Sequence, residues 1–138
     1  MRKVVRWLPL LLWMAIIFYM SGRTRDEVPS FGAWDLLVKK GAHFLAYGLC
    51  ALLAWGAVQG WKRPLRHHSM RPLLFAAIIT ILYAASDEIH QTFVPTRHGQ
   101  PLDVLIDTLG GLTMLLIIWW WSEKNKKGAD GNAITPLE

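Results

Sequence analysis

The chain has 138 residues, of which 53% are hydrophobic, and eight of them are tryptophans. So apolar a composition in so short a chain is typical of a membrane protein and argues against a soluble domain with a largely polar surface. The formal net charge is +5, and the single cysteine, Cys50, lies within an apolar run. An internal disulfide framework is therefore excluded.

Four apolar segments follow one another along the chain, at residues 7–22, 41–61, 72–94 and 102–122. Their length and composition predict four transmembrane helices. The first segment follows cationic residues, as the apolar core of a secretory signal does. Because "MSGRTR" contains no small-x-small cleavage site, we expect this helix to be retained. The predicted fold is an all-α membrane protein, a bundle of four transmembrane helices.

Two further segments have a different character. Residues 23–40 mix charges with Trp34, Leu37 and Val38 at helical spacing, which favours an interfacial helix leading into the second span. Residues 123–138 are polar without a hydrophobic period, and we expect a disordered tail there. The chain therefore divides into a transmembrane domain, residues 1–122, and a tail, residues 123–138.

The distribution of cations predicts how the helices are oriented. Most of the fifteen lysines and arginines lie at the start of the chain, between the second and third spans, and in the tail. The positive-inside rule then places both termini in the cytoplasm of a multi-pass plasma-membrane protein. The positive charge is explained by this topology and by contact with anionic lipids, so no nucleic-acid partner is predicted.

The third span ends in the polar stretch "SDEIHQ", residues 86–91, after a long uncharged run. From Pro72 to Ser86 a helix rises about 22 Å, which is less than the ~30 Å hydrocarbon core. Asp87, Glu88 and His90 are therefore expected at the outer edge of that core. Carboxylates at this depth should face the bundle interior and find partners there.

Helical spacing arranges the polar residues of three spans in stripes, because positions three and four apart share a helix face. The stripes are, in chain order, Lys39, His43 and Tyr47; Asp87, His90 and Gln91; and Asp103 and Asp107. All of them lie at the predicted outer ends of their helices. We expect them to form one acidic, histidine-bearing pocket that opens to the outside. Small residues such as Gly48 and Gly110 would allow the helices to approach closely enough to close it.

Three motifs, "KKGAHFLAY", "SDEIHQTFVPTRHG" and "DVLIDTLGG", carry a family resemblance. Together, over roughly residues 5–120, they resemble the VanZ-like family of small integral membrane proteins. The family's namesake is associated with low-level teicoplanin resistance in Gram-positive bacteria, which implies a role at the cell envelope. The family positions carried over are His43, Tyr47, Asp87, Glu88, His90, Gln91, Pro95, Arg97, Gly99, Asp103, Asp107 and Gly110. Many members carry an acid where this chain has Ala46 and asparagine where it has Asp107.

The resemblance leaves the chemistry open, and the pocket residues suit more than one function. The first is an enzyme acting on an envelope lipid or cell-wall precursor. Asp87 or Glu88 would be its general acid or base, and His43 or His90 the proton partner. Arg97 would anchor a phosphate or carboxylate, because a guanidinium suits an oxyanion better than a lysine does. The residues assigned to substrate binding are Arg97, Tyr47, Gln91, Asp103 and Asp107.

Two other functions need no proton transfer. The pocket could bind a lipid headgroup or the glycopeptide drug without chemistry, or it could transport or flip a small anion or lipid. Four helices are few for a transporter, so transport would require a homo-oligomer. The expected partners are membrane lipids, together with a cell-wall precursor or a glycopeptide.

No tight metal-binding signature such as H-E-x-x-H occurs, and we predict neither a metal nor another cofactor. His43, Asp87, His90 and Asp107 are nevertheless a ligand set that suits zinc or manganese.

Purely structural roles are also open for several of these residues. Arg97 could hold its loop by pairing with Asp103 or Glu88. Lys39 and Lys40 are expected to extend toward the outer headgroups.

Overall fold

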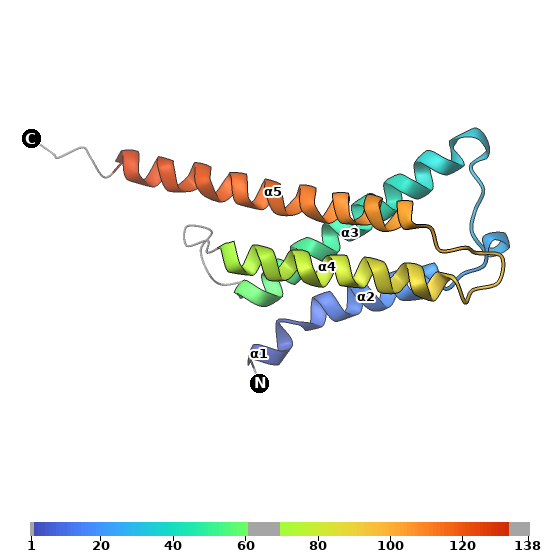
Figure 1. Ribbon diagram of the computed structural model, residues 1–138. Helices are drawn as coiled ribbons and strands as arrows, with labels where there is room; N and C mark the ends of the chain where they lie inside the picture. Colours follow the sequence, from blue (N-terminus) through green and yellow to red (C-terminus); the bar gives the residue numbers. More distant parts are fainter. Residues whose placement is uncertain (1, 61–69, 133–138) are drawn as a thin grey trace, which may run out of the picture.

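The structure is a computed structural model that describes residues 2–60 and 70–132. Within these ranges the chain is helical with turns and contains no strand, which confirms the predicted all-α class. The elements in chain order are α1 (Arg2–Val5), α2 (Leu8–Ser21), the 3₁₀ turns η1 (Arg25–Glu27) and η2 (Gly32–Trp34), α3 (Asp35–Gln59), α4 (Met70–Gln91) and α5 (Pro101–Asn132) (Figure 1).

Three of the described helices are long and apolar enough to cross a membrane, at residues 32–59, 70–91 and 101–125. At 1.5 Å per residue α4 is about 33 Å long, which matches the ~30 Å hydrocarbon core. α2 is also apolar but has only 14 residues. It is therefore about 21 Å long, and a fourth span formed by α2 stays a prediction.

Two helices extend beyond the segments expected from the sequence. α3 begins at Asp35 rather than near Gly41, so the expected interfacial helix is in part the first turns of the span itself. α5 continues past Ser122 to Asn132, so the backbone is helical over the first part of the expected tail. The residues that follow Ser122, "EKNKK", include strong helix formers and no proline, and they allow the helix to continue. Residues 133–138 of that tail, and the basic loop at 61–69 expected in the cytoplasm, lie outside the described residues.

α3 is the central helix and packs against both α4 and α5. Its buried side chains are mostly small, among them Ala51 and Ala54. α3 approaches α5 closely at Gly110, where an added Cβ would overlap the backbone carbonyl of Phe44. Packing of backbones across small residues is the mode that membrane helices favour. Gly110 therefore allows the short distance between α3 and α5.

The polar stripes meet at one end of the bundle. In Figure 1 the segment before α3 and the connection from α4 to α5 lie together, opposite α1 and the far end of α5. The start of α3, the end of α4 and the start of α5 are all at this end, as the sequence predicts. At all three places ionisable residues interrupt the apolar pattern.

Candidate functional site

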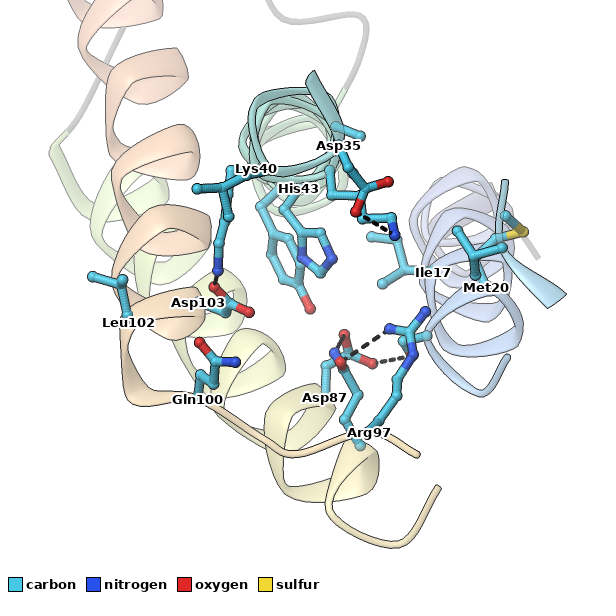
Figure 2. Close-up of a pocket in the computed structure, with 18 of the residues that line it drawn as sticks. Ile17, Met20, Asp35, Lys40, His43, Asp87, Arg97, Gln100, Leu102 and Asp103 are labelled. Atoms are coloured by element: carbon cyan, nitrogen blue, oxygen red, sulfur yellow. Dashed lines mark hydrogen bonds and ion pairs between the residues drawn. The ribbon is translucent and has the colours of Figure 1, made fainter. Parts of the chain in front are cut away.

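A cavity of about 780 Å³ lies among α2, the start of α3, the end of α4 and the start of α5. Its lining combines an apolar wall from α2 with polar side chains from the other elements. The ionisable residues of the lining are Asp35, Lys39, Lys40, His43, Tyr47, Asp87, Arg97, His98 and Asp103. Figure 2 shows His43, Asp87 and Arg97 projecting toward a common space from different sides. Most of the site residues expected from the sequence therefore share one cavity.

Asp87 is a buried carboxylate held from two sides. The hydroxyl of Ser21, at the end of α2, donates to Asp87 Oδ1 at 2.5 Å, and Gln91 Nε2 donates to Oδ2 at 3.3 Å. A hydrogen bond to an ionised acceptor in a buried position is among the stronger ones in proteins. The Ser21–Asp87 bond ties α2 to α4 and fixes the carboxylate at the cavity wall.

Gln91 connects the cation of the site to both acids of "SDEIHQ". Its Nε2 donates to Glu88 Oε1 at 3.0 Å as well as to Asp87, while its Oε1 accepts a bond from Arg97 Nη1 at 3.1 Å. Arg97 lies in the turn after α4, which is closed by a bond from its own N–H to the carbonyl of Val94 at 3.1 Å. This turn brings the guanidinium back over the end of α4.

His43, Glu88 and Asp107, one from each of α3, α4 and α5, form a second group; of the three, His43 lines the cavity. His43 Nδ1 lies 3.2 Å from Asp107 Oδ1, and the Asp107 side chain is completely buried whereas that of His43 is 27% exposed. Glu88 is also buried, and its Oε2 accepts the backbone N–H of Gln100 at 2.8 Å. A ligand atom from each member of this trio lies within 4.8 Å of the others.

Two ion pairs border the cavity. Lys40 pairs with Asp103 across the α3–α5 contact (Figure 2), and Lys39 pairs with Asp35 one turn away at 2.7 Å. The Lys40–Asp103 pair was not expected, because both lysines were expected to extend toward headgroups. The Lys39–Asp35 pair is about one third exposed, and pairs of this kind contribute little to stability.

His90 lies apart from the cavity. Its ring stacks on Phe18 of α2 with centroids 4.1 Å apart, and it borders a separate, smaller hollow next to Gly22. Asp87 and Gln91 line the cavity together, as the spacing predicted, whereas the ring of His90, expected on the same face, lies against Phe18 outside the cavity.

The α2 side of the cavity is mostly apolar. It consists of Trp13, Ile16, Ile17, Met20 and Ser21, and Figure 2 shows Ile17 facing the polar group from α2. Trp13 Nε1 donates to the backbone carbonyl of Ala46 at 2.9 Å, which fixes the indole between α2 and α3. The hydroxyl of Tyr47 is buried and has no hydrogen-bond partner among the described residues.

Sequence reasoning missed the contributions of Ser21 and of the Gln100 backbone. Ser21 is the last residue of an apolar helix, where a serine is common and indicates no particular function. Its position in the sequence does not relate it to Asp87. The Gln100 N–H carries no sequence signal, because any residue there except proline would present the same donor. Both contacts are long-range consequences of how the helix ends meet.

A comparison with profiles of known protein families shows which family the chain belongs to. The profile of the VanZ/LLP1 family matches residues 6–122, which contain the whole cavity lining. The chain belongs to the VanZ/LLP1 family. This VanZ/LLP1 assignment confirms the resemblance carried by the three motifs. Searches of curated proteins and of solved structures find no significant match.

Proposed function

We propose that this VanZ/LLP1 protein resides in the plasma membrane and binds the phosphate-bearing headgroup of an envelope lipid or lipid-linked cell-wall precursor. The cavity would open on the outer face, as the cation distribution predicts. The observation that carries the proposal is the two-sided lining of a single cavity, with cations and hydrogen-bonding groups on one side and an apolar wall on the other.

The polar side suits an anionic headgroup. Arg97 lines the cavity together with Lys39 and Lys40. A guanidinium has five donors in a fixed fork and can bind a phosphate while it keeps a bond to Gln91. The Lys39–Asp35 pair is partly exposed, so exchange of its carboxylate for a phosphate oxygen costs little.

The apolar side suits the first part of a lipid chain. Trp13 and Ile17 lie deeper along α2 than Met20, so the apolar wall continues from the polar end into the span. A volume of about 780 Å³ lies within the range of small-molecule sites. It accommodates a headgroup and the adjoining part of a chain, with the remainder of the chain in the surrounding lipid.

The resistance phenotype implied by the family resemblance would follow indirectly. Binding an envelope lipid or a cell-wall precursor would change how teicoplanin reaches its target. The competing explanation is that the protein binds the glycopeptide directly. In that case the purified protein need not retain any phospholipid.

Acid–base chemistry on the bound headgroup is a second candidate function. It is favoured by the partly exposed His43, whose Nδ1 faces the buried Asp107, because a buried carboxylate can orient an imidazole for proton transfer. Asp87 and Glu88 stay candidates for the acid or base. A His43→Gln variant that retains lipid but loses function would support chemistry over binding alone.

The experiment that tests headgroup binding measures phosphate-bearing lipid retained per chain after purification in a mild detergent. We expect Arg97→Ala to lose most of the retained lipid, and Arg97→Lys to lose part of it, because a lysine keeps the charge without the bidentate geometry. Lys124→Ala is the matched control, since Lys124 stacks over Trp120 on α5 away from the cavity. Equal retention by the wild type and Arg97→Ala would contradict the proposal.

A further inference from the structure

We propose that His43, Glu88 and Asp107 bind a divalent transition-metal ion of the zinc or manganese type. They come from three different helices, and their ligand atoms lie within 4.8 Å of one another. The trio differs from the ligand set considered from the sequence, because Glu88 takes the place of Asp87 and His90. This site goes beyond the proposed lipid binding and does not depend on it.

The distances suit a shared ion. Ligand atoms at about 2.0–2.2 Å from a tetrahedral zinc lie about 3.4 Å from one another. His43 Nδ1 and Asp107 Oδ1 are 3.2 Å apart, which is close to that separation. The other separations within the trio, all below 4.8 Å, require side-chain adjustments on the order of 1 Å to reach this geometry.

The charge of the trio also suits a divalent cation. Glu88 and Asp107 are two buried carboxylates in close proximity, and like charges in the interior of a bundle disfavour one another. The nearby Lys40 pairs with Asp103 instead. A dication bound by a neutral imidazole and two carboxylates would leave no net charge at the site.

Asp107 supplies an independent observation. Its side chain is completely buried, and its Oδ2 has no hydrogen-bond partner among the described residues. A buried acceptor without a partner carries a desolvation penalty of about 1–3 kcal/mol, more for a charged group. Coordination by a metal would satisfy this oxygen at the same place where the ligand atoms converge.

The surroundings of Glu88 resemble those of a metal-binding carboxylate. Gln91 and the backbone N–H of Gln100 each donate to one of its oxygens, and such outer bonds orient ligands. Imidazole with carboxylates suits zinc or manganese better than a purely oxygen-binding cation. Three protein ligands leave the fourth coordination position of a tetrahedral ion open, as at catalytic zinc sites. Because His43 lines the cavity, the bound ion would lie at the cavity wall.

The test is the metal content of the full chain, purified through a tag without histidines and measured by inductively coupled plasma mass spectrometry. We expect roughly one equivalent of zinc or manganese per wild-type chain. Asp107→Asn and Glu88→Gln should lower the affinity for added Zn²⁺ or Mn²⁺ at least about tenfold, and Gln91→Leu by about 10–100-fold through loss of orientation. Asp35→Asn is the control, with the same chemical change on α3 outside the trio, and should retain the metal.

A second readout covers variants that fold poorly. Adding Zn²⁺ or Mn²⁺ after chelation should raise the unfolding temperature of the wild type, because the ion binds the folded state. Wild-type protein with less than about a tenth of an equivalent of metal, and no rise in unfolding temperature with either ion, would overturn the site. Asp107→Asn binding metal as tightly as the wild type would also overturn it. Neither outcome affects lipid retention through Arg97, so the two proposals fail separately.

Discussion

At the scale of single residues, the site depends on carboxylates that are each held by a partner from another element. Asp87 shows this most clearly, since Ser21 donates to it at 2.5 Å from the end of α2. The predicted depth of "SDEIHQ", at the outer edge of the hydrocarbon core, implied that these acids would face the bundle interior, and the burial of Asp87 and Glu88 agrees with that prediction. Helical spacing had placed Gln91 beside them, but their partners from other elements were not predictable, because Ser21 and Gln100 carry no periodic or compositional signal.

We predict that Ser21 and Asp87 are energetically coupled. Ser21→Ala leaves a buried carboxylate oxygen without its donor, which should cost about 1–3 kcal/mol of stability. Asp87→Asn weakens the same bond, so the double variant should lose less than the sum of the single losses, by about 1 kcal/mol or more. The measurement is a double-mutant cycle on purified protein unfolded in detergent. Additivity within about 0.5 kcal/mol would show that the bond does not tie α2 to α4.

At the scale of helices, the packing of α3 on α5 depends on small residues, and the sequence predicted this role for Gly110. Gly110 lies where a Cβ would overlap the Phe44 carbonyl, whereas a Cβ at Gly41 would meet nothing within 4 Å. Helix identity and order were predictable because long apolar runs leave few alternatives in a membrane. Helix ends were less predictable: α3 begins within the segment expected to form a separate interfacial helix, and α5 extends into the segment expected to be a disordered tail.

These two glycines give a matched pair of variants. Gly110→Ala should lower the unfolding temperature, because α3 and α5 must separate to admit the methyl group. Gly41→Ala should leave it unchanged or raise it, since alanine is favoured over glycine in a helix by about 1 kcal/mol. Thermal unfolding followed by circular dichroism compares them directly. A Gly110→Ala protein as stable as the wild type would mean that the helices do not approach as closely as described.

At the scale of the whole molecule, all the polar stripes lie at one end of the bundle, and the cation distribution predicts that this end faces the outside. Single cysteines on a Cys50→Ala background would test this orientation. In intact cells a membrane-impermeant maleimide should label Ser30→Cys, in the exposed segment before α3. Lys124→Cys, exposed near the other end of α5, should react only after permeabilisation. The reverse pattern would place the cavity on the cytoplasmic side.

The central claim is that the cavity at this end of the bundle carries the function of this VanZ/LLP1 protein. Its most direct test is teicoplanin susceptibility of a Gram-positive host that expresses the wild type or the variants Asp87→Asn, Glu88→Gln and Arg97→Ala, at membrane levels matched by immunoblot. We expect the wild type to protect and all three variants to lose protection, while the Lys124→Ala control protects fully. Variants that protect as well as the wild type would contradict the claim, and a wild type without protection would show that the resistance role does not extend to this chain.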